Sequence, residues 1–295
     1  MRHRLFMVLA LASCATDIDF DEGQTSQDVD SNNGTSLNGT SLNGTSLNGT
    51  SLNGTSLNGT SLNGTSLNGT SISATSTSGP PLSGTGPVGS TWSGTSTNGA
   101  AVTLKINSAT QGTGTNADLW FYGVSFQTSA GWQPLCGLDS TGAPILAVPV
   151  AGAWKATASD AAHYVTGTQF TWGCRLKTVA KCVELGYKTW KGYTNQLQAC
   201  VRLLRADFCG TGQSYTTDGR LLNLYDNVGV QKDTETWKPE AEWTTAGARC
   251  VNSNNIARYT LALQANPKCT LPLQSSTCGT SFGTGSLLID ELAPQ

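Results

Sequence analysis

The chain has 295 residues, of which 12% are charged, and its formal net charge is −2 at pH 7. This balance argues against an electrostatic nucleic-acid binder, which would carry a basic stripe and a high isoelectric point. The longest apolar run, residues 5–12, is too short for a transmembrane helix, which needs about 20 apolar residues.

The N-terminus is typical of a bacterial lipoprotein precursor. Arg2 and Arg4 precede the apolar run, as in a signal peptide, and residues 11–14 read Leu-Ala-Ser-Cys. This segment resembles the lipobox, in which small residues before a cysteine fit the signal peptidase and the thiol is linked to diacylglycerol. The sequence therefore predicts a signal peptide over residues 1–13 and a lipid anchor on Cys14. The bilayer would be its partner, and the outer membrane of the cell envelope its location. An ordinary secretory signal with an incidental Cys14 is the alternative.

Residues 33–102 follow a period of five. Seven identical copies of Asn-Gly-Thr-Ser-Leu run from Asn33 to Leu67, and a glycine or alanine keeps the register in later, degenerate copies. The unit resembles the pentapeptide-repeat family, in which four pentads form one coil of a square, right-handed β-helix with leucine inside. The resemblance implies a short quadrilateral β-helix over residues 33–102, stabilised by stacking of neighbouring repeats. Residues 14–32 would be a linker.

A tether is the alternative for this tract. Only one residue in five is apolar in the repeat, which leaves little burial to offset the entropy of ordering. Segments rich in glycine and serine behave as flexible spacers. Pro80, Pro81 and Pro87 would also interrupt the hydrogen bonds of a strand ladder.

Mixed helix and strand patterns fill residues 103–295, which we predict to form a cysteine-rich α+β domain. Alternating or aromatic-rich runs favour strands, and two segments carry apolar residues at helical spacing. The predicted strands are residues 102–106, 119–126, 144–150, 164–172, 221–225, 259–263 and 287–292, and the predicted helices are residues 177–185 and 195–206.

Eight cysteines remain beside Cys14, and an even number in an exported chain favours disulfides. No CxxC pair or histidine partner accompanies them, so we expect no metal site, and no motif indicates a cofactor. The eight are Cys136, Cys174, Cys182, Cys200, Cys209, Cys250, Cys269 and Cys278.

The two predicted helices suggest a pairing for half of these cysteines. If the helices form an antiparallel hairpin, Cys182 can reach Cys200 inside it and Cys174 can reach Cys209 outside it. Elimination and spacing then pair the other four as Cys136–Cys250 and Cys269–Cys278.

One segment of this domain resembles a known family. Residues 198–210 read Gln-Ala-Cys-Val-Arg-Leu-Leu-Arg-Ala-Asp-Phe-Cys-Gly, which is similar to the signature of the ADYC domain, found mainly in myxobacteria. Phe208 stands where the family has tyrosine, so a phenolic hydroxyl is not needed there. The family has no established activity, so the resemblance implies a fold and an exported context but no catalytic residues. Supporting stretches are residues 132–136, 181–187, 190, 240–243 and 247–250.

Arg202, Arg205 and Asp207 are candidate binding residues. The two arginines lie one turn apart and can share a helix face, which suits a carboxylate or phosphate ligand. The alternative is a salt-bridged helix end beside a disulfide, with Gly210 as the stop signal.

Trp237 and Trp243 are a second candidate pair for binding, because they and two nearby acids could line a sugar cleft. Glycosidic chemistry needs two opposing carboxyl groups, and Glu240 and Glu242 are too close in sequence to oppose one another unaided. Packing in a disulfide-rich core is the alternative for the tryptophans. His163 belongs to no recognisable catalytic triad.

We therefore expect an exported, membrane-anchored lipoprotein whose head is a binding or structural module rather than an enzyme, with an envelope or extracellular ligand. The alternative is an extracytoplasmic hydrolase acting on polysaccharide or cell wall. Two carboxyl groups about 5 to 9.5 Å apart across an open cleft would favour the hydrolase. Its acids would come from Asp207, Asp218, Asp226, Glu240 and Glu242.

Replacing Cys14 with serine should abolish lipid attachment, because the thioether forms on the thiol. Metabolic labelling with a palmitate analogue should mark the wild-type chain and leave Cys14→Ser unmarked. Ser13→Ala, which keeps a small residue before the cysteine, should still be labelled. Persistent labelling of Cys14→Ser would contradict the anchor.

Overall fold

The computed structural model describes most of the chain from residue 84 onward and short strands before it. Cys14, residues 14–32 and Asp218 lie outside the described residues. None of the helices in the described part is long and apolar enough to cross a membrane. The described residues are 36–38, 47–48, 55–57, 60–68, 71–76, 81–82, 84–96, 101–155, 163–212, 214–216, 221–265, 269 and 272–294.

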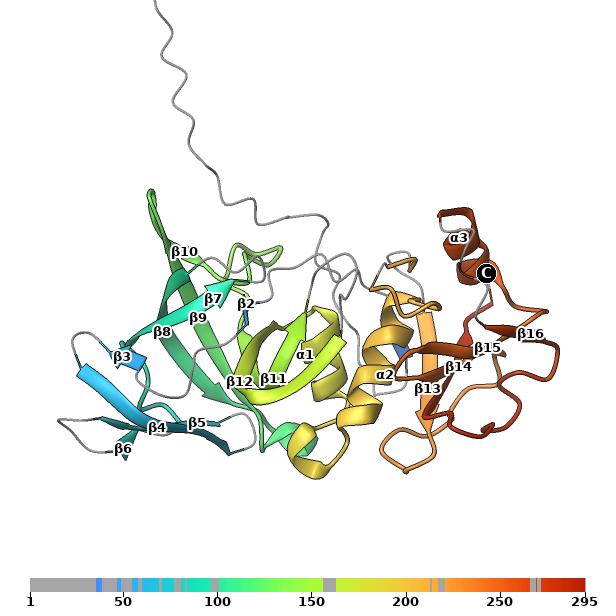
Figure 1. Cartoon of the computed structure of the whole chain (residues 1–295), viewed down its shortest axis with the longest axis horizontal. Helices are drawn as coiled ribbons and strands as arrows, with labels where there is room; N and C mark the ends of the chain where they lie inside the picture. The colour runs from blue at the N-terminus through green and yellow to red at the C-terminus, as the bar shows by residue number, and fades with distance from the viewer. Residues whose placement is uncertain are drawn as a thin grey trace, which may run out of the picture.

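The described residues form a sheet-rich arrangement of mixed helix and strand. Two large sheets lie on either side of a pair of helices (Figure 1). The expected α+β class is therefore correct only as a mixture of helix and sheet, because strands dominate the described part.

The first large sheet, here called the closed sheet, returns on itself because β8 pairs with both β7 and β9. Its ring is β8-β9-β11-β12-β2-β7, and β10 extends β9 as a hairpin. The strands are β2 (Leu47–Asn48), β7 (Thr91–Ser96), β8 (Ala101–Gln111), β9 (Trp120–Thr128), β10 (Gly131–Pro134), β11 (Ala147–Lys155) and β12 (His163–Cys174).

Alternation along these strands sorts the side chains between two cores. Tyr122 and Val124 of β9 join Trp92 and Trp172 in a core cluster on the inner face of the closed sheet. Phe121, which directly precedes Tyr122, belongs instead to the core that contains the helices. Residues 91–96, which the sequence assigns to the repeat tract, thus form part of this sheet.

The repeat tract also supplies a small sheet of four strands. Each strand pairs antiparallel with the next along the chain, so these strands do not form the stacked coils of the predicted β-helix. β4 runs straight through nearly two pentads, and Asn68 pairs with Ser71 only three residues on, as in a hairpin. The strands are β3 (Thr55–Leu57), β4 (Thr60–Asn68), β5 (Ser71–Ser76) and β6 (Pro81–Leu82).

The second large sheet, here called the open sheet, has the order β1-β13-β17-β14-β15-β16. Only the β15–β16 pair is parallel among its described pairings. Its strands are β1 (Ser36–Asn38), β13 (Leu221–Asp226), β14 (Lys238–Thr244), β15 (Gly247–Asn252), β16 (Leu273–Ser275) and β17 (Leu288–Leu292).

A helix replaces one predicted strand. Residues 259–263 lie within α3 (Ala257–Ala265), so the prediction of a strand there is wrong. Tyr259 and Ala262 are buried three residues apart, which is helical spacing, and a short apolar run fits either structure by pattern alone.

Between the large sheets lie α1 (Thr178–Glu184) and α2 (Thr194–Arg205), close to the two predicted helices. The turn η2 (Thr189–Lys191) connects them, and η1 (Gly114–Asn116) precedes β9. Leu197, Val201 and Leu204 of α2 are fully buried in the core between the sheets. Their spacing of three and four residues places them on one helix face.

Four disulfides join the described cysteines, and they correct most of the predicted pairings. Cys182–Cys200 is confirmed and links α1 to α2. Cys174 does not pair with Cys209, because Cys174 ends strand β12 and the helix begins only at Thr178. The predicted Cys136–Cys250 and Cys269–Cys278 pairs are also wrong. The other observed pairs are Cys136–Cys174, Cys209–Cys269 and Cys250–Cys278.

Replacing Cys182 and Cys200 together with alanine should lower the free energy of unfolding by about 3 kcal/mol, because the bridge closes a loop with a sequence separation of 18. Urea unfolding under oxidising conditions measures the change. A free energy equal to that of the wild-type chain would show that the bridge does not hold the two helices together.

Candidate binding pocket

The end of α2 fixes the geometry of the candidate site. Ala206 has a left-handed backbone with a φ of 55°. Its N–H donates to the carbonyl of Leu203, and the N–H of Asp207 donates to the carbonyl of Arg202, both at 2.9 Å. These two bonds form a Schellman motif, which usually has glycine at the left-handed position. Alanine there costs on the order of 1 kcal/mol, so surrounding contacts must hold the turn.

Asp207 ties the next turn to the helix. Its carboxylate is fully buried and accepts hydrogen bonds from the backbone N–H groups of Thr211 at 2.9 Å and Gly212 at 2.8 Å. It also forms an ion pair with the Nη1 of Arg202. Of the two interpretations of these residues, the salt-bridged helix end is therefore what the structure shows.

Phe208 packs between two other rings. Its ring centroid lies 5.0 Å from that of Trp243 and 5.2 Å from that of Tyr259, and its carbonyl accepts a hydrogen bond from the N–H of Ala248. Trp243 is fully buried, so it cannot line a sugar cleft. Trp237 is half-buried before β14.

Arg205 is a buried cation with incomplete hydrogen bonding. It is 4% exposed, and its Nη2 donates to the carbonyl of Gly212. Its Nε and Nη1 have no hydrogen-bond acceptor in the part of the chain that the structure describes. Burial is the main cause that lowers the pKa of Arg205 to about 10, with Asp207 opposing the shift and Arg202 adding to it. The guanidinium therefore stays charged at neutral pH.

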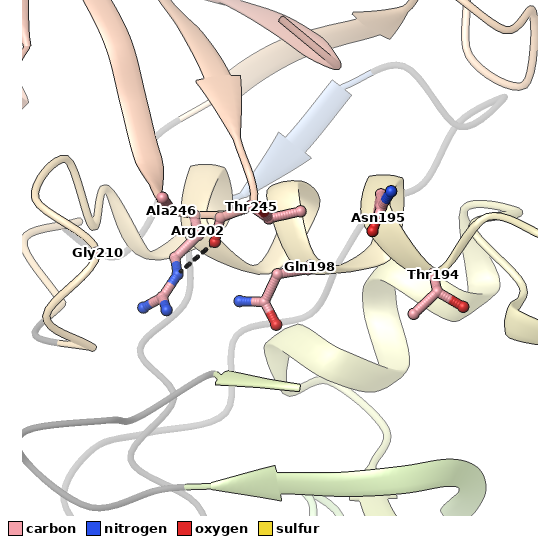
Figure 2. Close-up of a pocket in the computed structure, with 7 residues that line it drawn as sticks. All are labelled: Thr194, Asn195, Gln198, Arg202, Gly210, Thr245 and Ala246. Carbon is pink, nitrogen blue, oxygen red and sulfur yellow. Dashed lines mark hydrogen bonds between the residues drawn. The ribbon is translucent and has the colours of Figure 1, made fainter. Parts of the chain in front are cut away.

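A pocket of about 370 Å³ lies between α2 and the turn that joins β14 to β15. Figure 2 shows Gln198 and Arg202 extending from α2 toward the pocket and Thr245 approaching from the turn. The Nε of Arg202 donates to the Thr245 carbonyl at 3.4 Å. The volume is within the usual range for a small-ligand site. The lining residues are Thr194, Asn195, Gln198, Arg202, Gly210, Thr245 and Ala246.

Gly210 permits the approach of the two walls. A Cβ at this position would lie 1.8 Å from the carbonyl oxygen of Ala246, and its φ of 65° also favours glycine. Sequence reasoning found Arg202 but missed Gln198 and Thr245. It took Gly210 for the stop signal of the helix, which is wrong because α2 ends at Arg205 with Ala206 in the left-handed conformation. A glutamine that begins the signature segment, within an otherwise apolar stretch of helix, was the available signal.

Two of the acids considered for catalysis hold loops in place. Asp226 accepts hydrogen bonds from the N–H groups of Val228, Val230 and Gln231 and from the hydroxyl of Tyr187. It is 8% exposed. These contacts make Asp226 a structural group of the loop that follows β13.

Glu242 is held in the same way by a different loop. Its carboxylate accepts from the N–H groups of Gly279 and Gly283 at 3.2 and 2.9 Å and pairs with Arg249 at 3.1 Å. Burial would raise the pKa of Glu242, but a hydrogen bond from the Ser286 hydroxyl, those from Gly279 and Gly283 and the Arg249 charge lower it below its usual value. Glu242 also lies within 4.8 Å of the sulfurs of Cys250 and Cys278. Those sulfurs are bonded to each other, so neither is the thiolate that binds metal.

Glu240 belongs to a buried cluster of charges with Arg258 and Asp290. The Nε of Arg258 donates to Glu240 at 3.0 Å, and its Nη2 donates to Asp290 at 2.6 Å. Asp290 also accepts from the Nε1 of Trp243 at 2.7 Å. The three charged side chains are at most 2% exposed. Glu240 and Asp290 therefore do not face each other across an open cleft.

The cluster is neutral when one carboxyl group keeps its proton. Burial and then the charge of Glu240 raise the pKa of Asp290 well above its usual value. Burial alone would lower the pKa of Arg258, but the charges of Glu240 and Asp290 raise it. The protonated Asp290 then donates a hydrogen bond to Glu240, and Arg258 balances the one ionised carboxylate. This arrangement avoids a net buried charge.

Comparison with known families identifies two regions. Residues 84–257 match the ADYC domain, and residues 33–73 match eight copies of the pentapeptide repeats. The first match begins just before β7 and includes every residue of the pocket. No curated protein and no solved structure matches the chain.

Asp290→Asn should weaken the pH dependence of stability. A pKa that is higher in the folded than in the unfolded chain means that the folded chain keeps a proton that the unfolded chain releases. The free energy of unfolding then falls as pH rises from about 4 through the raised pKa. Asparagine is neutral throughout and can still accept from Trp243 and donate to Glu240, so this fall should disappear.

Urea unfolding at several pH values between about 4 and 8 measures the effect. Glu240→Gln is the complementary variant, because removing the Glu240 charge should let Asp290 ionise beside Arg258. An unchanged pH profile in Asp290→Asn would mean that Asp290 is ionised in the folded chain.

Proposed function

The chain belongs to the ADYC domain family, and from that premise we propose that its head is a non-enzymatic binding module of an exported, lipid-anchored envelope protein. The pocket beside α2 is the proposed site. Its lining offers amides, hydroxyls and one guanidinium, which suits a polar ligand such as an envelope polysaccharide or peptidoglycan.

One observation carries the proposal. Arg202 and Asp207, which sequence reasoning singled out, are paired with each other, and a pocket with amide, hydroxyl and guanidinium groups in its lining lies between α2 and the β14–β15 turn. Asp207 fixes the loop and Phe208 fills the core. Asp207 and Phe208 therefore hold the backbone beside the pocket in place, as the support of a binding site would.

The anchor and the repeats give this module its setting. Cys14 would be acylated and hold the chain on the outer membrane. The eight copies of the repeat follow Cys14 and precede the ADYC match in the sequence. Because β1 and β2 of this tract pair with strands of the two large sheets, only the rest of the tract would act as a spacer. A bound ligand would then be held near the membrane.

The hydrolase alternative gains no support from the described acids. The four described acids of this alternative are at most 8% exposed, and each accepts hydrogen bonds from neighbouring residues of the chain. They are Asp207, Asp226, Glu240 and Glu242. A hydrolase needs two carboxyl groups that can reach one substrate bond.

Asn195→Trp should block the pocket. Asn195 lines the pocket and is exposed on the first turn of α2, so a large ring there fills the space without disturbing the core. In a binding and hydrolysis screen on envelope polysaccharides and peptidoglycan, the oxidised full-length chain should bind one class without shortening it. Asn195→Trp should weaken that binding at least about tenfold, or about 1.4 kcal/mol.

Asn254→Trp is the matched control, because Asn254 is also exposed but does not line the pocket. It should bind as the wild-type chain does. Release of shortened fragments would establish the hydrolase instead. Undiminished binding by Asn195→Trp would place the ligand elsewhere.

A further inference from the structure

We propose that the pocket takes the anionic group of its ligand, a carboxylate or a phosphate, over the buried guanidinium of Arg202, to which the nearby Arg205 adds a surplus positive charge. The inference rests on the proposed binding function and names the chemistry that the pocket selects. It starts from the unequal numbers of positive and negative side chains at the end of α2, beside the pocket.

Three ionisable groups meet at the end of α2 with unequal charge. Arg202 and Arg205 each carry a positive charge, and Asp207 carries one negative charge. Arg202 and Asp207 form an ion pair, which accounts for two of the three. Arg205 is left with a buried positive charge and with two nitrogens that have no acceptor among the described residues.

A buried, unbalanced cation is costly, and a nearby anion removes much of the cost. Within the described residues, Asp207 and Arg202 are the two charges that act on Arg205. Among the described acids, the one that acts on Arg205 is Asp207, and Asp207 is already paired with Arg202. An anion from outside would supply the missing negative charge.

The pocket is the route by which an anion can approach. Arg202 lines it while being 2% exposed, so its guanidinium forms the floor. None of the seven lining residues is acidic, so nothing in the lining would repel a carboxylate. The pocket also begins at the first turn of α2, a helix of 12 residues, where the helix dipole adds a partial positive charge.

The test compares a charged sugar with its neutral counterpart. Galacturonate, galactose and inorganic phosphate are titrated at constant ionic strength into the isotope-labelled full-length chain. The side-chain amide of Gln198 and the backbone amides of Thr245 and Ala246 report pocket occupancy by nuclear magnetic resonance. Galacturonate should shift these signals at concentrations at which galactose does not.

Arg205→Met isolates the surplus charge. Arg205 does not line the pocket, so methionine, a side chain of similar length, leaves the lining and the Arg202–Asp207 pair in place. The affinity for galacturonate should fall about tenfold, because a unit charge is lost near the site. The thermal midpoint should not fall, because buried donors without acceptors are removed. Lys232→Met, which removes an exposed charge outside the pocket lining, should change neither.

The outcomes separate this inference from the proposed function. Shifts with galacturonate but not with phosphate would show that the pocket binds a sugar carboxylate. Shifts with both would show that it binds oxyanions in general. The wild-type chain alone can contradict the anionic preference. It does so if galactose and galacturonate cause equal shifts, or if neither galacturonate nor phosphate causes a shift. Binding that is still blocked by Asn195→Trp would then leave the pocket as the site of a neutral ligand.

Discussion

The packing of α2 and α3 against the open sheet depends on one buried guanidinium. Arg258 of α3 donates to Glu240 on β14, to Asp290 on β17 and to the carbonyl of Leu203 in α2. A buried cation is tolerated only with close partners, and removing one partner of such a group typically costs about 3 to 5 kcal/mol. Arg258 therefore fixes the positions of α2, α3, β14 and β17 relative to one another.

The pocket inherits its shape from that arrangement. Asp290 accepts a hydrogen bond from the indole of Trp243, and Trp243 packs on Phe208. Phe208 lies two residues after Ala206, which has the left-handed conformation. Cys209 then ties the same segment to Cys269. The signature segment is thus a structural device that ends α2 and brings the β14–β15 turn over it. Its buried residues support the pocket, and its residues Gln198, Arg202 and Gly210 also line it.

The periodicity of apolar residues predicted many of the helices and strands of this fold, but it did not predict the buried charged residues. Alternation predicted β8, β9 and β12, and helical spacing predicted α1, α2 and the Cys182–Cys200 bridge. The pattern failed where charges are buried, because periodicity assigns charged residues to the surface. β14 carries Glu240 and Glu242 at buried positions, and no sequence signal marks them as inward. The Cys209–Cys269 bridge spans 60 residues, so its pairing depends on tertiary packing, as does the meeting of Gln198 with Thr245.

Native-state hydrogen exchange on Arg258→Met tests this account most directly. The account predicts that protection falls together in the last turn of α2, in α3, in β14 and in β17, because all four meet at the guanidinium. The closed sheet, whose inner core is separate, should keep its protection. The account would be contradicted if exchange in α2 and β14 were unchanged, or if the closed sheet lost protection equally. Either result would mean that the buried cluster does not specifically hold α2 and α3 against the open sheet.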